Sequence, residues 1–142
     1  MIIEQLTHID DVALKAFKKL IPQLTGEQER YPTREELQKV IQSKDAFIFI
    51  AKENNEIIGT LTLAFYHIPS GKRAWIEDVV VDESARGKGV AASLMNHAIS
   101  VVRENGIRKI DLTSRPFRKA ANKLYLKLGF EIRDTNYYRL TL

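Results

Sequence analysis

The hydrophobic pattern of this chain changes its period near residue 45, and this change limits the possible fold more than any other sequence feature. Before that point, apolar residues recur at helical spacing over Ile9–Leu20 and again over residues 37–41. After it, short apolar runs are separated by turn residues, which is typical of buried strands. These runs cover residues 46–51, 57–67 and 75–81. The chain therefore combines two early helices with an antiparallel meander.

The helix ends are predicted from capping residues. Thr7 is the expected N-cap of the first helix and Pro22 its end, while Pro32-Thr33 indicates the start of the second. The third helix is expected over residues 87–104, with Asn105-Gly106 as its C-cap. The other expected elements are strands at residues 1–5, 107–112, from Gly129 onward and 136–142, and a helix over 116–128 that Pro116 opens.

The element order is therefore β-α-α-β-β-β-α-β-α-β-β. It predicts an α/β (α+β) fold, with a mixed sheet of about six or seven strands flanked by about four helices. A length of 142 residues fits one domain, residues 1–142. Hydrophobic residues at 44% and charged residues at 28% are typical of a soluble protein, so we expect no membrane association.

The chain has no cysteine, which excludes disulfides, thiolate metal sites and a cysteine nucleophile, and fits a cytoplasmic location. Its three histidines lack metal-ligand spacing, so no metal is expected. The formal net charge of +4 suits a polyanionic ligand without proving one. No cluster of stacking aromatics accompanies the basic residues, which argues against a nucleic-acid-binding domain.

The most informative segment is the strand Trp75–Val81 with the turn Arg86–Gly89 that follows it and opens a helix. The first N–H groups of a helix lack internal partners, and the helix dipole adds positive charge there. Glycines at the turn allow phosphate to approach the backbone, so a polyanion site is predicted. The other interpretation is a solvated turn. The spacing matches neither a P-loop nor a dinucleotide fingerprint.

Two motifs resemble those of the GNAT superfamily of acetyl-coenzyme A-dependent N-acetyltransferases. Arg86-x-x-Gly89-x-Ala91 resembles the family's Arg/Gln-x-x-Gly-x-Gly/Ala signature. About 30 residues on, Ala121–Phe130 is similar to its Ala-x-x-Leu-Tyr-x-x-x-Gly-Phe helix and strand. The element order also fits the GNAT fold, so the resemblance covers essentially the whole chain.

The resemblance implies that acetyl-CoA lies along the strand and that its pyrophosphate is held at the turn. The strand backbone would pair with the pantetheine arm, and residues of the second motif would add coenzyme contacts. The implied coenzyme-binding residues are Val79, Val80, Val81, Arg86, Gly87, Lys88, Gly89, Val90, Ala91, Asn122 and Lys123. The valine side chains also fit plain core packing, which is compatible with binding through the backbone.

Acetyl transfer needs a neutral amine and a proton for the departing thiolate. Glu77 is the first candidate for the general base, because a partly desolvated carboxylate on this strand would have a raised pKa. Asp78 is the second and is expected on the opposite strand face. Each also fits a structural carboxylate or an anchor for the substrate ammonium. The resemblance makes Tyr125 the general acid, although it also fits a buried aromatic, and the Val79 N–H is an expected oxyanion donor.

The resemblance thus implies an enzyme that moves an acetyl group from acetyl-CoA to a primary amine by direct transfer through a ternary complex. The alternative is a non-catalytic acyl-CoA-binding sensor or regulatory module, which would tolerate the loss of Tyr125 and Glu77. The acceptor stays open between small molecules and protein amines. A homodimer is a candidate assembly, because dimers are common among such proteins.

Overall fold

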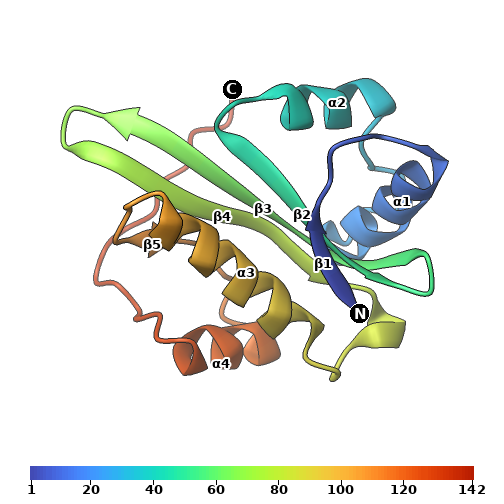
Figure 1. The fold of residues 1–142 in the computed structure, drawn as a ribbon. Coiled ribbons are helices and arrows are strands. Elements are labelled where there is room, and N and C mark those ends of the chain that lie inside the picture. Colours follow the sequence, from blue (N-terminus) through green and yellow to red (C-terminus); the bar gives the residue numbers. More distant parts are fainter. The chain divides into compact units, whose positions relative to one another are not determined.

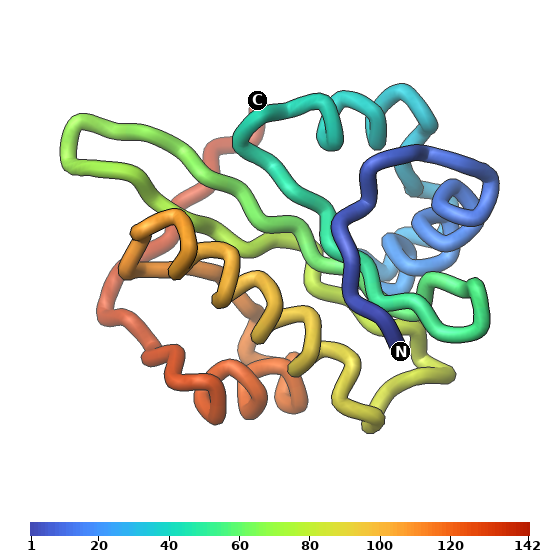
Figure 2. The backbone as a smooth tube through the Cα atoms, viewed as in Figure 1, coloured from blue at the N-terminus to red at the C-terminus, as the bar shows by residue number.

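The computed structural model describes all residues 1–142 (Figure 1; Figure 2 traces the same path). In chain order the elements are β1 (Ile2–Gln5), α1 (Asp11–Thr25), α2 (Arg34–Gln42), β2 (Ala46–Glu53), β3 (Glu56–Ile68), β4 (Gly71–Val81), the 3-10 turn η1 (Glu83–Ala85), α3 (Val90–Glu104), β5 (Ile110–Asp111) and α4 (Lys119–Lys127). The predicted order of helices and strands is confirmed from β1 to α4. None of the helices has the length and apolar character that crossing a membrane requires.

The chain divides into two compact units, residues 1–112 and residues 113–142. The first unit contains the sheet with α1, α2 and α3, and the second contains α4 and the C-terminal segment. The expectation that residues 1–142 act as one domain stays a prediction.

The sheet of the first unit is mixed, as expected, with strand order β1-β2-β3-β4-β5. The pairs from β1 to β4 are antiparallel, whereas β4 and β5 are parallel. The three long strands form the meander that the apolar runs predict, and α3 supplies the connection that a parallel pair requires. The β5 strand is short and pairs only Ile110 with Ala74 and Asp111 with Trp75.

The expected count of six or seven strands is wrong, because the sheet has five. Neither the segment from Gly129 nor residues 136–142 form a strand. At Phe130 the backbone N–H donates to the Tyr125 carbonyl at 3.0 Å, so it closes the end of α4 instead of joining a ladder. Farther on, Ile132 and Tyr138 are almost fully exposed. A segment with apolar residues forms a strand only where the edge of another strand is available to pair with it.

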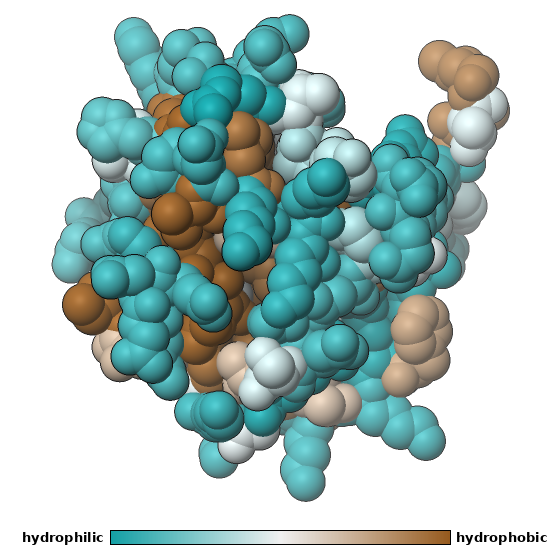
Figure 3. Space-filling view, turned by 90° about the vertical axis from the view of Figure 1, so that its right-hand side faces the viewer, coloured by the Kyte–Doolittle hydropathy of each residue, from teal (hydrophilic) through white to brown (hydrophobic).

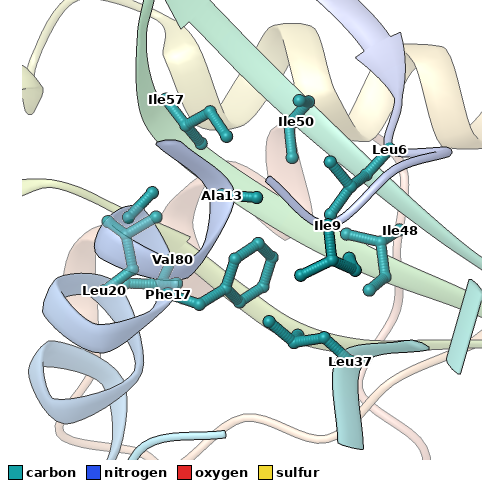
Figure 4. Packing of buried hydrophobic residues seen from close by; sticks show 11 residues of the cluster. Leu6, Ile9, Ala13, Phe17, Leu20, Leu37, Ile48, Ile50, Ile57 and Val80 are labelled. Atoms are coloured by element: carbon teal, nitrogen blue, oxygen red, sulfur yellow. The ribbon is translucent and has the colours of Figure 1, made fainter. Parts of the chain in front are cut away.

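The sheet is apolar on both faces. Along β2, Ile48 and Ile50 belong to one cluster with residues of α1 and α2. Phe49 lies between them on the opposite face, and its ring packs edge-on against the His97 ring of α3, with 4.6 Å between the ring centroids. The faces therefore carry different helices, which explains why residues 46–51 are continuously apolar. Figure 4 shows the first cluster: Leu6, Ile9, Ala13, Ala16, Phe17, Leu20, Leu37, Ile48, Ile50, Ile57 and Val80.

Three predicted helix starts are wrong by a few residues. The N-cap of α1 is Asp10, whose carboxylate accepts the Ala13 N–H at 2.8 Å, and not Thr7. Both residues suit a cap, but helical backbone angles begin only at Asp11. The α3 helix begins at Val90 because Gly87 and Gly89 have left-handed angles, and α4 begins at Lys119 because a turn follows Pro116.

The predicted end of α1 is also wrong, because the helix continues through Pro22 to Thr25. Proline lacks a backbone N–H, but its carbonyl still accepts a hydrogen bond, here from Gly26 at 2.8 Å. The start of α2 is as predicted, with Thr33 and Glu36 forming a reciprocal capping box.

On the side of the molecule that carries α1 and the β2–β3 turn, an apolar band crosses a largely hydrophilic surface (Figure 3).

Candidate active site

A β-bulge interrupts β4 at the predicted carboxylates. Thr62 of β3 pairs with Glu77 and Thr60 with Val80, so two β4 residues lie opposite the single β3 residue between them. One of the two, Asp78, has a φ of 51°, a left-handed conformation that is strained for any residue other than glycine. Bulges of this kind redirect side chains and backbone groups. The regular alternation that places Glu77 and Asp78 on opposite faces therefore does not hold here.

The two carboxylates differ in their surroundings, although both side chains are solvent-accessible. Glu77 accepts a hydrogen bond from the indole Nε1 of Trp75 at 2.7 Å. For Asp78, partial desolvation raises the pKa above the ordinary carboxyl value, and the charge of Glu77 adds to the shift. A raised pKa makes a carboxylate the stronger base, which favours Asp78, the second candidate from the sequence, as the general base.

The C-terminal half of β4 has no strand partner on the side of β5. Pairing with β5 stops at Trp75, so Ile76–Val81 pair only with β3. An unpaired strand edge presents backbone N–H and C=O groups to an extended ligand. Val80 is buried in the cluster beneath α1, as the core-packing interpretation requires, while Val79 and Val81 are half-buried.

The turn after β4 leads into a helix without a side-chain cap. Gly87 and Gly89 have φ values of 77° and 79°, and a Cβ built on either would meet no atom within 4 Å. Gly89 caps α3 without any side-chain hydrogen bond, and the first turn holds no acidic residue. By contrast, Asp10 caps α1 and Thr33 caps α2. The first N–H groups of α3 are thus available to an anion, beside the exposed cations of Arg86 and Lys88.

Two further contacts fix this helix end against the sheet. The Arg86 Nε donates to the Val81 carbonyl at 3.2 Å, which ties the turn to the end of β4. On β3, a Cβ on Gly59 would lie 3.1 Å from a Val90 methyl and 3.3 Å from a Leu94 methyl. Because Gly59 lacks a side chain, the first turn of α3 packs directly on the strand. Sequence reasoning missed Gly59, and a lone glycine inside an apolar strand was the available signal.

Sequence reasoning also missed a polar cluster around Asp82, at the end of β4. The Asp82 carboxylate is buried and accepts hydrogen bonds from Lys19 Nζ at 2.6 Å, Gln23 Nε2 at 3.0 Å and Ser84 Oγ at 2.9 Å. Burial alone would raise the pKa of Asp82, but these three hydrogen bonds outweigh it and lower the pKa to about 2. Lys19 and Gln23 are on α1, about sixty residues earlier in the chain, so no local pattern announces the cluster.

The second unit carries the predicted residues of the Tyr motif on α4. The Tyr125 side chain is buried, and its ring packs against that of Phe130 at 6.0 Å. Burial raises the pKa of the Tyr125 hydroxyl, although the charge of Arg118 opposes the shift, so the hydroxyl is protonated at neutral pH. The meeting of Tyr125 with the carboxylates of β4 at one thioester stays a prediction.

The other predicted residues of the second unit have local roles as well. The Asn122 amide donates to the Arg115 carbonyl at 3.0 Å, which holds the loop before α4, and Lys123 is exposed. Ser114 has a buried hydroxyl without any hydrogen-bond partner. Such an orphaned group is costly unless a ligand or water satisfies it. Sequence reasoning gave no reason to single out Ser114. No group of three or more His, Asp or Glu side chains is placed to hold a metal ion.

Comparisons with known proteins agree on one family. The sequence profile of the acetyltransferase (GNAT) family matches residues 13–130. The N-alpha-acetyltransferase MAK3 of Arabidopsis thaliana is 31% identical over 94 residues, which are 66% of this chain and 49% of that protein. The uncharacterized N-acetyltransferase YhdJ of Bacillus subtilis (strain 168) is 31% identical over 100 residues, 68% of this chain and 69% of that protein. This chain therefore spans about half the length of the Arabidopsis protein.

Solved structures agree on the fold. The structure of AAC(6')-Iy in complex with the bisubstrate analog CoA-S-monomethyl-acetylneamine matches with a TM-score of 0.77 at 23% identity. The match covers 99% of this chain and 97% of that one. At this identity the likeness concerns the fold alone.

Proposed function

Because this chain belongs to the GNAT family of acetyltransferases, we propose that it is an N-acetyltransferase that takes its acetyl group from acetyl-CoA and passes it directly to a primary amine. One observation carries the proposal: the unpaired half of β4 leads through η1 into a glycine turn and a helix start that has no side-chain cap and is flanked by cations. The pantetheine arm of the coenzyme is extended and suits the strand edge, and the pyrophosphate that follows it suits the helix start.

The residues of the first unit fit acetyl-CoA in chemistry. The backbone groups of Val79, Val80 and Val81 would hold the pantetheine arm in the manner of an added strand. The N–H groups from Gly87 to Ala91 would hold the pyrophosphate, with Arg86 and Lys88 adding charge. From the second unit, Asn122 and Lys123 are proposed as further coenzyme contacts.

The proposed chemistry needs one base and one acid. When bound, the coenzyme supplies an acetyl thioester that an amine can attack. An alkyl ammonium with a pKa of about 10.4 must first lose a proton, and Asp78 is the proposed acceptor of that proton, because its raised pKa makes it the better base. Glu77, held by Trp75, is the second candidate and otherwise an anchor for the ammonium group.

As the new C–N bond forms and the C–S bond breaks, two further groups act. The Val79 N–H lies at the bulge and is proposed to donate to the carbonyl oxygen as that oxygen gains negative charge. The Tyr125 hydroxyl, protonated at neutral pH, is proposed to give its proton to the departing sulfur. The transfer needs neither a metal nor a covalent intermediate on the protein.

The acceptor is proposed only as far as an amine. The similar proteins named above differ in what their names state: one is an N-alpha-acetyltransferase, and the other was solved with a bisubstrate analog that joins CoA to acetylneamine. We propose that the two units function as one domain. A cytoplasmic location is part of the proposal, because acetyl-CoA is an intracellular metabolite.

Two experiments in sequence test this function. Calorimetric titration of the purified protein with acetyl-CoA should show saturable binding. Replacement of an exposed lysine away from the proposed site, as in Lys15→Met, should leave that binding unchanged. A thiol-release screen over amines should then show turnover that depends on both acetyl-CoA and an amine. Saturable acetyl-CoA binding without turnover on any amine, with the same affinity in Tyr125→Phe, would favour the acyl-CoA sensor. Absence of binding would refute the coenzyme assignment.

A further inference from the structure

The polar cluster around Asp82 connects α1 to the segment that leads into the phosphate turn. Lys19 and Gln23 lie one helical turn apart on α1, and both donate to the Asp82 carboxylate. Gln23 also accepts the backbone N–H of Glu83 through its Oε1 at 3.0 Å. Its amide is thus engaged at both ends, once with the side chain of Asp82 and once with the backbone of η1.

Asp82 also anchors the backbone on both sides of itself. Its N–H donates to the Ile58 carbonyl at 2.8 Å, and its carbonyl accepts the Ala85 N–H at 2.8 Å. The Ser84 hydroxyl donates to the same carboxylate. One buried residue therefore holds together the end of β4, the neighbouring β3, the 3-10 turn η1 and helix α1.

The turn beyond η1 has little other support. Residues 86–89 are exposed, and the positions where Gly87 and Gly89 would carry a Cβ face open space. The turn is held at its far end by the packing of Val90 on Gly59 and at its near end by the Asp82 cluster, with one contact from Arg86 to Val81. The direction of its N–H groups therefore depends on how firmly the near end is held.

We infer that Lys19, Gln23 and Asp82 form a positioning bridge through which α1 holds the phosphate turn in the geometry that binds the coenzyme. The inference rests on the proposed function. It assigns no contact between the bridge and the coenzyme, because Asp82 is buried and acts through the backbone of η1. The bridge lowers the dissociation constant of CoA by preorganising the turn before the phosphates arrive.

Electrostatics and positioning predict opposite results for Asp82→Asn. Removal of a negative charge near an anion site should by itself strengthen the binding of CoA. Loss of the bridge should weaken it, because an amide cannot accept all three side-chain hydrogen bonds of the carboxylate. We expect the dissociation constant of CoA to rise about tenfold.

Lys19 provides a second variant in case Asp82→Asn folds poorly. Lys19→Met should raise the dissociation constant by a similar factor, and Lys19→Arg should restore most of the affinity because a guanidinium can still donate to Asp82. Lys15→Met removes the same charge one helical turn earlier, where the side chain is exposed, and should leave CoA binding unchanged. It controls for the loss of a cation on α1.

A destabilising control separates positioning from general stability. Leu37 of α2 is buried in the cluster beneath α1 and is absent from the bridge, so Leu37→Ala should lower the melting temperature without weakening CoA binding. Calorimetric titration with CoA, at a temperature where every variant is folded, is the measurement.

Three results are informative. Weaker CoA binding in Asp82→Asn and Lys19→Met, with Lys15→Met and Leu37→Ala unchanged, supports the bridge. Unchanged binding in folded Asp82→Asn and Lys19→Met, or an equal loss in Leu37→Ala, overturns the bridge and leaves the proposed function standing. Failure of the wild-type protein to bind CoA overturns the proposed function and this inference with it.

Discussion

Replacement of Gly89 by alanine separates the effect of backbone strain from the effect on coenzyme binding. Gly89 has a φ of 79°, and Gly106 at the other end of α3 has a φ of 72°. A Cβ at either position would meet no atom within 4 Å. The two glycines therefore match in conformation and in empty surroundings, and they differ mainly in which end of the helix they occupy.

The cost in stability should be the same at both positions. An L-residue in the left-handed region costs about 1 kcal/mol, so Gly89→Ala and Gly106→Ala should each lower the melting temperature by about 3 °C. Only at Gly89 would the methyl group stand beside the N–H groups proposed to hold pyrophosphate. We expect the dissociation constant of acetyl-CoA to rise at least about tenfold there, equivalent to about 1.4 kcal/mol.

The assay combines thermal unfolding with calorimetric titration of each variant. Equal shifts in melting temperature, with weaker acetyl-CoA binding in Gly89→Ala alone, are the expected result. If both variants bind acetyl-CoA as the wild type does, the helix start of α3 is not the phosphate site. If Gly106→Ala weakens binding equally, strain in α3 and not contact at Gly89 explains the loss.

Further predictions concern the proposed acid and base, acid stability and the core. Tyr125→Phe should lower kcat about a hundredfold or more while the dissociation constant of acetyl-CoA changes little, as single-turnover and titration data would show. In the wild type, kcat/KM should rise with pH, and the midpoint of this rise should lie above the ordinary carboxyl range because the pKa of Asp78 is raised. Asp78→Asn should abolish the rise. Glu77→Gln is the matched comparison and should retain it. The folded pKa of Asp82, about 2, lies below its ordinary value of about 4, so its contribution of about 2 kcal/mol is complete above pH of about 4 and is lost as pH falls toward 2. Denaturant unfolding should show this loss in the wild type and not in Asp82→Asn. Leu20→Ala, in the core beneath α1, should cost about 3 kcal/mol in the same assay.

The sequence predicted the parts of the fold that depend on local patterns. The change of hydrophobic period located the meander, and Pro32-Thr33 marked the start of α2, where the structure completes a capping box within four residues. The glycines of the Arg86–Ala91 motif were expected at a turn before a helix, and both have left-handed angles there. These features need no information from distant residues.

The sequence-based predictions failed where contacts between residues distant in sequence determine the structure. The C-terminal segment alternates apolar and polar residues, yet it forms no strand, because a strand needs a partner edge that sequence does not reveal. The bulge at Asp78 depends on the register between β3 and β4, so the choice between Glu77 and Asp78 was open to sequence reasoning. The Lys19–Asp82 contact joins residues 63 positions apart, and a lysine on an exposed helix face is ordinarily solvated.

The most direct test of the central claim follows the acetyl group itself. The protein is incubated with acetyl-CoA that carries heavy carbon in its acetyl group and with a panel of primary amines, and the products are identified by mass spectrometry. We predict an amide that carries the labelled acetyl group, formed with free CoA in equal amount and lost in Tyr125→Phe. Label that appears only in acetate, or that stays on acetyl-CoA with every amine, would contradict the assignment as an N-acetyltransferase.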